Sequence, residues 1–321
     1  IYNYFLKPVF LDLKKLFKIS FLPPLLIYLA AGVSSITGIV GIFFIKDYLN
    51  LSAAFLAGLG FWAGIPWALK MPLGHVVDLI WNRKNILIYI GAILISISLL
   101  IMFFLISNTE LMTNYMSAEK WFILSTILSP IGYVLQDVVA DAMTVEAIPT
   151  YDQNNIKYTD KEIKAMHTTM QTFGRFSIIG GTVIVAALNI YFFKDATALL
   201  ESQKIILYSK IYLYALIIPF ISISGIILSK IFFKKNNLNF DKVKPNYSII
   251  FGSLIFVIFV STVGLANHPM SQEIVFFGSL FIVIYLMKNL LKKISANLRR
   301  TIIGSAIIIF AFRTVPVVGT G

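Results

Sequence analysis

The sequence predicts an all-α, polytopic membrane protein, and three observations lead to that prediction. Hydrophobic residues make up 58% of the chain and charged residues 13%, whereas soluble domains carry roughly 25% charged residues. The mean hydropathy is +0.83. Apolar runs long enough to cross about 30 Å of hydrocarbon recur along the whole length. We therefore expect an integral, multi-pass protein in contact with the lipid bilayer.

The first residues, NYFLKPVFLDLKKLFKISF, predict an amphipathic helix on the membrane surface. At helical spacing the lysines fall on one side, and the leucines and phenylalanines fall on the other. Pro23 and Pro24 then separate this helix from the first membrane span. No cleavable signal peptide is visible. Because the chain starts with Ile1, we expect it to be part of a longer protein.

Nine membrane spans follow from the apolar runs. They cover about 25–45, 52–72, 85–106, 121–146, 165–192, 205–232, 248–266, 272–291 and 301–319. With a cytoplasmic N-terminus, twenty lysines and arginines, including Lys70 and Lys84, fall in cytoplasmic connectors and five fall on the other side. This asymmetry predicts the orientation, and a bacterial inner membrane is the expected location.

The fourth predicted span carries two aspartates in the stretch QDVVADAMTVE. Asp137 and Asp141 are four residues apart, so they share a helix face, and Tyr133 lies on the same stripe. Glu146 follows on the opposite side at the cytoplasmic end. An ionised side chain at the bilayer centre costs roughly 2.5–3.5 kcal/mol, so carboxylates in a span usually serve a function.

The fifth predicted span carries a matching polar face. Gln171 and Arg175 are four residues apart on it, and Arg175 and Asp137 both lie ~15 Å from the cytoplasmic ends of their helices. We therefore expect an Asp137–Arg175 pair, and Arg313 in the ninth span reaches a similar depth. The alternative is that these charges only neutralise one another and stabilise the bundle.

The connector GHVVDLIWNRKN suggests a conformational gate. Gly74 would allow close packing at a helix end, and Asp78 would accept from backbone donors at a neighbouring helix N-terminus. Arg83 follows on the cytoplasmic side, and Glu146 is expected near the same level. The alternative, a connector that only obeys the positive-inside rule, explains Arg83 but not Asp78.

Two tryptophans and two small-residue runs allow less specific predictions. Trp62 and Trp67 lie inside the second predicted span, where they would stack on a flat heterocycle or, as the commoner use, pack against helices. The runs AAGVSSITGIVG and IIGGTVIVAA favour close approach of helices and imply no ligand.

Composition excludes several kinds of chemistry. The chain has no cysteine, so disulfides, thiolate catalysis and cysteine-ligated metals are excluded, and its three histidines are scattered. We expect no metal and no cofactor. The net charge of +12 comes from short connectors, which membrane topology explains better than a nucleic-acid partner.

Three stretches together carry a resemblance to a known family. FFIKDYLNLSAAFLAGLGFWAGIPWALKMPLGHVVD, WNRKNILIYIGA and QDVVADAMTVEA resemble the folate-biopterin transporter family, a branch of the major facilitator superfamily. The resemblance covers about residues 22–190, and the region around Asp137 is its most specific part. The general superfamily connector places an arginine and a glycine where this chain has Leu79 and Trp81.

The resemblance implies a major facilitator-type bundle made of two six-helix halves. It divides the chain into a surface helix (1–21), an N-terminal six-helix half (22–233), a basic cytoplasmic linker (234–247), an inserted helical hairpin with a basic connector (248–300) and the first helix of the second half (301–321). It also implies proton-linked movement of a folate or pterin held between the halves. Arg175 and Arg313 would then bind an anion, and Asp137 or Asp141 would carry the coupling proton.

Three other functions remain open at this point. A related carrier would move a muropeptide or another anion, and an assembly factor of the same fold would transport nothing. A membrane prenyltransferase, the remote enzyme alternative, needs a second aspartate cluster for Mg²⁺ and diphosphate, whereas the other aspartates of this chain stand alone. We therefore expect a transporter and not an enzyme.

Overall fold

The chain forms helices joined by short connectors, as the sequence predicts. The computed structural model describes residues 17–44, 53–152, 154, 156–194, 199–232, 244–266, 270–292 and 294–313. Across these ranges the only β pairing is one isolated bridge between Tyr151 and Lys157. The all-α prediction is therefore confirmed for the described residues. The predicted surface helix at 1–21 lies outside them except for its last five residues, of which Ile19–Phe21 form the 3₁₀ helix η2.

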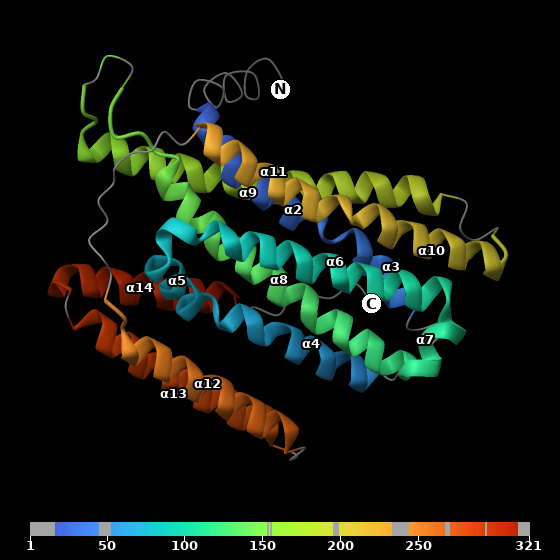
Figure 1. Cartoon of the computed structure of the whole chain (residues 1–321). Coiled ribbons are helices and arrows are strands. Elements are labelled where there is room, and N and C mark those ends of the chain that lie inside the picture. Colours follow the sequence, from blue (N-terminus) through green and yellow to red (C-terminus); the bar gives the residue numbers. More distant parts are fainter. Residues whose placement is uncertain are drawn as a thin grey trace. The chain divides into compact units, whose positions relative to one another are not determined.

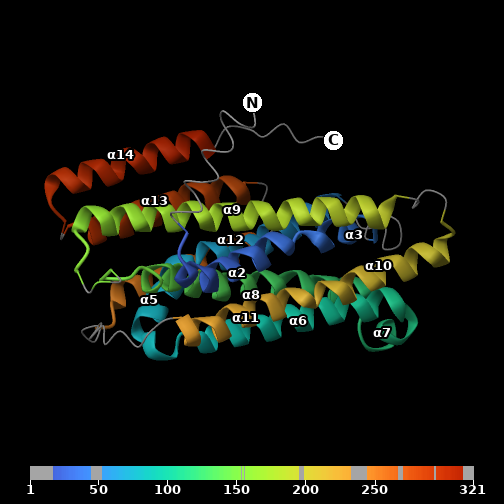
Figure 2. The same cartoon turned by 90° about the horizontal axis from the view of Figure 1, so that it is seen from above.

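Two compact units make up the chain, Ile1–Lys244 and Pro245–Gly321. The long helices of the first unit run side by side (Figures 1 and 2). Its α-helices are α2 (Leu22–Val33), α3 (Ile36–Phe44), α4 (Ala53–Ala68), α5 (Lys70–Leu79), α6 (Asn85–Ser107), α7 (Thr109–Tyr115), α8 (Ala118–Glu146), α9 (Asp160–Phe193), α10 (Glu201–Ala215) and α11 (Ile217–Phe232). The short helix η4 (Trp81–Arg83) connects α5 to α6.

Six helices in the described ranges are long and apolar enough to cross a membrane. They are Ile19–Gly38, Asn85–Ser107, Ala118–Glu146, Asp160–Phe193, Glu201–Phe232 and Tyr247–Gly264. They correspond to the first, third, fourth, fifth, sixth and seventh predicted spans. The structure therefore supports an integral, multi-pass membrane protein. The described parts of the other three predicted spans are helical, apart from Leu69 in the second, and lie outside this set.

The second predicted span, 52–72, is wrong as a continuous helix. It divides at Leu69, where α4 ends and α5 begins. Pro72 has no backbone N–H, so it cannot donate to the carbonyl of Ala68, and proline in a helix interior breaks the hydrogen-bond ladder. At the break itself, the amide of Leu69 donates to Pro66 O, three residues earlier, at 3.1 Å. The first residue after this break is Lys70.

Pairs of facing glycines bring helices of the first unit into close contact at two places. A Cβ on Gly91 of α6 would meet Gly132 O of α8 at 2.6 Å, and a Cβ on Gly132 would meet Gly91 O at 2.7 Å. On α2 and α9, Gly32 and Gly181 make an equally close approach, because a Cβ on Gly181 would meet Leu29 O at 2.8 Å. The small-residue interpretation of the two runs is confirmed at Gly32 and Gly181, since backbones in a membrane pack tightly where side chains are absent.

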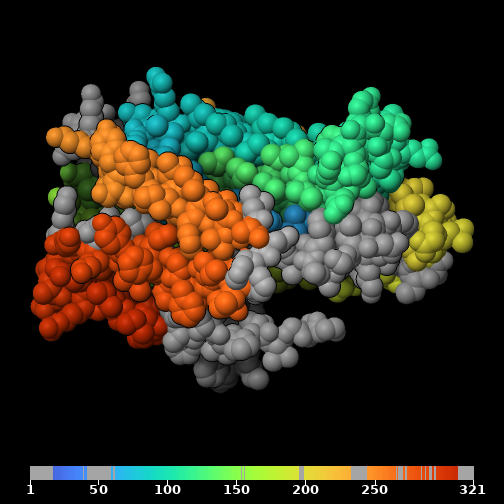
Figure 3. Space-filling view, turned by 90° about the horizontal axis from the view of Figure 1, so that it is seen from below, coloured from blue at the N-terminus to red at the C-terminus, as the bar shows by residue number. Residues whose placement is uncertain are grey.

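The outward faces of the helices are apolar. On α6, Ile90, Ile93, Ile97 and Phe104 are all exposed, and this helix forms the cyan surface at the top of Figure 3. In water such a surface would be costly, whereas in a bilayer it faces hydrocarbon. The exposed apolar face thus agrees with the membrane assignment.

The second unit contains α12 (Tyr247–Leu265), α13 (Ser271–Leu291) and α14 (Ala296–Arg313). Helices α12 and α13 pack against each other as a hairpin. Gly278 of α13 receives the ring of Phe259 from α12, because a Cβ at this glycine would overlap the ring. These helices coincide with the predicted hairpin, and α14 begins five residues before the predicted ninth span.

Candidate functional site

The two aspartates of α8 share one lysine. Lys70 Nζ lies 2.5 Å from Asp137 Oδ2 and 2.9 Å from Asp141 Oδ2. The hydroxyl of Tyr28 donates to Asp141 Oδ1 at 2.6 Å. We call Tyr28, Lys70, Asp137 and Asp141 the Lys70 cluster.

Three helices position the Lys70 cluster. The aspartates lie one turn apart on α8, which packs against α2 and α5 (Figures 1 and 2). Tyr28 comes from the middle of α2 and Lys70 from the first residue of α5. The break at Leu69 therefore places a cation beside two carboxylates of a neighbouring helix.

Charge in the Lys70 cluster is unbalanced, since one ammonium faces two carboxylates. The side chain of Asp137 is 14% exposed, whereas those of Asp141 and Lys70 are each 42% exposed. Arg175 of α9 also interacts electrostatically with Asp137 and Tyr28. Counting Arg175, the four ionised side chains carry no net charge.

The predicted Asp137–Arg175 pair is wrong, because Asp137 pairs with Lys70. Arg175 is exposed, and among the described side chains it lies in no ion pair within 4 Å. The charge asymmetry of the sequence predicts Lys70 in a cytoplasmic connector and not in the site. The available signal was the spacing P-W-A-L-K-M-P, in which two prolines flank the lysine and break the helix at the end of an apolar run.

Of the other predicted residues of the site, two contact residues of α8 or α2, and the third belongs to the second unit. Gln171 Nε2 donates to Thr144 Oγ1 of α8 at 3.5 Å. Tyr133 lies next to Ser34, where α2 ends. The backbone of Arg313 ends α14 in the second unit, and its side chain is outside the described residues.

The predicted gate residues do not behave alike. A Cβ on Gly74 would meet its nearest atom, Val138 Cγ1, only at 3.9 Å, so the expected close packing at this glycine is wrong. Asp78 is exposed, and within the described ranges no backbone donor of a helix N-terminus reaches it, so the expected hydrogen bond is wrong as well. Arg83 is exposed at the end of η4.

Glu146 instead pairs with Lys84, which the sequence predicts only as a cytoplasmic residue of the connector GHVVDLIWNRKN. Lys84 Nζ lies 2.6 Å from Glu146 Oε1, with exposed fractions of 6% for the lysine side chain and 21% for the glutamate. The same ammonium sits 4.1 Å from the centre of the Trp81 ring. This pair ties the start of α6 to the end of α8; we call it the Lys84 pair.

The two tryptophans of α4 differ in exposure. Trp62 is partly buried, whereas Trp67 is 45% exposed. This difference fits both stacking on a flat heterocycle and packing against helices, so ring stacking stays a prediction.

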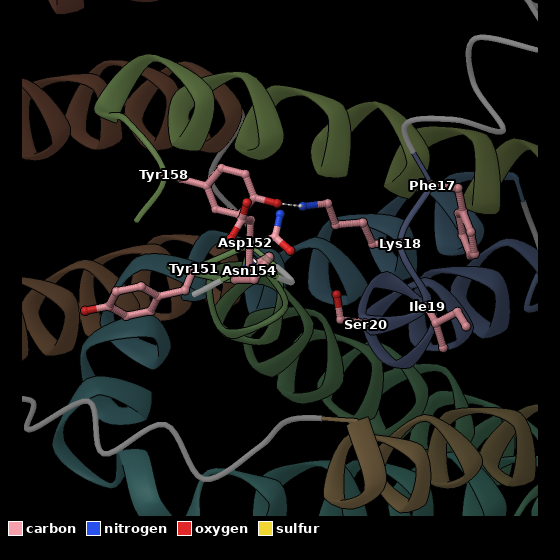
Figure 4. A pocket seen from close by; sticks show the side chains of 9 residues that line it. Phe17, Lys18, Ile19, Ser20, Tyr151, Asp152, Asn154 and Tyr158 are labelled. Atoms are coloured by element: carbon pink, nitrogen blue, oxygen red, sulfur yellow. Dashed lines mark hydrogen bonds between the residues drawn. The ribbon is translucent and has the colours of Figure 1, made fainter. Parts of the chain in front are cut away.

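A pocket of about 690 Å³ opens where α2 begins, beside the connector between α8 and α9 (Figure 4). Lys18 Nζ points across it to Tyr158 Oη at 3.2 Å and to Met166 Sδ at 3.1 Å. Asp152 accepts from the amides of Asn154 and Ile156 in the connector. Lys18, Ser20 and Asp152 of this pocket thus already have hydrogen-bond partners within the protein.

Comparison of the chain with known protein families, with curated proteins and with solved structures found no match. The family resemblance therefore stays a prediction from the residues that carry it. Within the described side chains, no three histidine, aspartate or glutamate residues gather to hold a metal ion. What the geometry establishes is a membrane-helix bundle with a four-residue polar cluster at a helix break.

Proposed function

We propose that this protein is a secondary transporter that moves an anionic solute of the folate or pterin class by alternating access, coupled to protons. The observation that carries the proposal is the Lys70 cluster, in which two carboxylates share one lysine within an apolar bundle. Ionisable residues in membrane proteins commonly mark substrate or proton pathways. Within the cluster one lysine faces two carboxylates, and the set is neutral only when the more distant Arg175 is counted.

The helix break adds independent support. In many transporters the substrate and coupling ions bind where membrane helices are discontinuous. Here α4 and α5 are separated at Leu69, and Lys70 is the first residue of α5. A short helix joined at such a break can tilt more easily than a continuous span, so its cation can move relative to α8.

Charge arithmetic links proton and anion. When one aspartate of the cluster is protonated, the set of Asp137, Asp141, Lys70 and Arg175 changes from neutral to a net charge of +1. An anion then finds an unmatched cation in a region of low dielectric constant, where the attraction is stronger than in water. Folates meet this requirement through their glutamate carboxylates.

The test is uptake of labelled folic acid into proteoliposomes that contain the protein from the complete reading frame. We expect an inward-directed proton gradient to drive uptake, and Asp137→Asn to abolish the gradient-driven part. Glu119→Gln, which changes an exposed carboxylate in the first turn of the same helix, α8, is the matched control for loss of one charge.

Two outcomes would change the proposal. Uptake that ignores both the gradient and Asp137→Asn would remove the proton-coupled mechanism. Absence of folate uptake by folded protein would reject the solute class, and a screen of muropeptides and other anions would follow. Protein that moves none of these anions would leave the assembly-factor alternative.

A further inference from the structure

The two carboxylates of the Lys70 cluster have unequal surroundings. Both oxygens of Asp141 face donors, because Oδ1 accepts from the Tyr28 hydroxyl and Oδ2 lies at Lys70 Nζ. Only Oδ2 of Asp137 faces a donor, which is the same ammonium. No other donor within the described residues reaches Asp137 Oδ1.

This difference determines which of the two aspartates is protonated at the lower free-energy cost. A proton on either oxygen of Asp141 removes charge from an atom that accepts from the Tyr28 hydroxyl or lies at the Lys70 ammonium, so it weakens that interaction. Within the described residues no donor reaches Asp137 Oδ1, so a proton there weakens only the interaction of Lys70 with the other oxygen, Oδ2. Hydrogen bonds to a carboxylate favour its charged form, and burial favours its neutral form, and Asp137 is the more buried of the two, at 14% against 42% exposed.

We infer that Asp137 is the carboxylate that takes up the coupling proton, at Oδ1, while Tyr28 and Lys70 keep Asp141 ionised. The inference deepens the proposed function and rests on it for the use of that proton. In the step itself, a hydronium ion gives its proton to Asp137 Oδ1, so that one O–H bond breaks, one O–H bond forms and a water molecule is released; no bond to carbon or nitrogen changes. Lys70 then matches Asp141, and the charge of Arg175 is left to attract an anion.

The position of Tyr28 depends on a glycine of α9. A Cβ on Gly174 would lie 3.0 Å from Tyr28 Cε2 and 3.1 Å from Cδ2, so this glycine provides the space in which the ring sits. The tyrosine is 5% exposed. Gly174 is therefore a positioning residue for Tyr28, and movement of α9 relative to α2 would change the hydrogen bond to Asp141.

Other ionisable side chains on the neighbouring elements define the electrostatic surroundings of Asp137. Helix α4 carries none. Those on α2, α5, α6 and α9 in this part of the bundle are Tyr28, Lys70, His75, Asp78, Tyr89, His167 and Arg175. Of these, Tyr28, Lys70 and Arg175 interact with Asp137.

Infrared difference spectroscopy of the reconstituted protein from the complete reading frame tests the assignment without any substrate. A pH titration is followed through the C=O stretch of protonated carboxyl groups, with D₂O exchange to identify the band. We expect Asp137→Asn to remove a titrating band that Asp141→Asn leaves in place. We also expect Tyr28→Phe to add a second titrating carboxyl, because Asp141 loses one of its two donors.

The inference is overturned if Asp141→Asn removes the band and Asp137→Asn does not, or if neither variant changes the titration. The Asp78→Asn variant serves as a control, and its spectrum should match that of the wild type near the assigned band. Failure of the proposed function shows separately, since a protein that moves no anion would still show which aspartate titrates. Conversely, proton-driven uptake with the band assigned to Asp141 would keep the transporter and reject this assignment.

Discussion

Helix α8 carries two ion clusters that differ in their balance. Near its end Glu146 meets Lys84 alone, and the lysine is 6% exposed with its ammonium over the Trp81 ring. About one and a half to two and a half turns earlier, Asp137 and Asp141 share Lys70, which is 42% exposed. The first arrangement is a buried pair of one cation and one carboxylate. The second is a partly exposed set of one cation and two carboxylates.

The difference separates a structural contact from a site that can change state. A matched and desolvated pair loses several kcal/mol when either partner is removed, so it resists change. An excess carboxylate can instead be neutralised by a proton and leave the remaining pair intact. Exposure points the same way, because the side chains of Lys70 and Asp141 are each 42% exposed, whereas that of Lys84 is 6% exposed.

Replacing the shared cation should have the largest effect. Lys70→Gln leaves two carboxylates facing each other without a counter-ion, and like charges at this distance repel strongly. We expect proton-driven uptake in proteoliposomes to fall to the background of empty vesicles.

A charge-balanced double variant distinguishes lost coupling from lost folding. Lys70→Gln combined with Asp141→Asn removes one charge of each sign, so we expect thermal stability to recover towards wild type while uptake stays at background. Normal uptake by Lys70→Gln would show that Lys70 serves only the positive-inside topology.

Breaking the matched pair should affect stability and not coupling. Glu146→Gln leaves Lys84 without its carboxylate, and we expect a loss of about 2–3 kcal/mol, below the roughly 3–5 kcal/mol of fully buried pairs, because the glutamate is 21% exposed. Thermal unfolding in detergent measures this change. Proton dependence of uptake per folded molecule should match wild type, and a changed pH profile would mean that the pair belongs to the transport cycle.

A smaller effect is expected at Gly174, which contacts the ring of Tyr28. Gly174→Ala puts a methyl group 3.0 Å from the ring, so we expect a net loss of about 1 kcal/mol after the gain in helix propensity and a few-fold slower uptake. Gly180→Ala on the same helix is the matched control, since a Cβ there would meet nothing within 4 Å. That control should be neutral or stabilising by up to about 1 kcal/mol. Equal effects of the two substitutions would exclude a special role for Gly174.

The smallest change is expected at an exposed pair. Lys204 Nζ lies 2.9 Å from Glu201 Oε1, and the glutamate is 69% exposed. Glu201→Gln should cost less than about 0.5 kcal/mol, because exposed pairs in a helix contribute little. A loss as large as that of Glu146→Gln would remove exposure as the explanation for the difference between the ion pairs.

Sequence patterns predicted some parts of this molecule well and others poorly. Hydropathy and length located the helices, because burial in hydrocarbon forces the backbone to bond within each segment. Helical spacing placed Asp137 and Asp141 on one face, and both contact Lys70 in the structure. Partner choice failed, since depth along a helix does not say which neighbour a side chain faces.

The sequence by itself determined that this is a multi-pass helical membrane protein with two acidic side chains on one face of a span. These properties follow from local quantities, namely apolar length and helical period. Only the tertiary structure decided that Lys70 meets both aspartates, that Glu146 meets Lys84, and that Gly174 receives Tyr28. Each of these contacts joins residues more than 60 positions apart in the chain, so each depends on how the helices pack and rotate against one another, which no local pattern encodes.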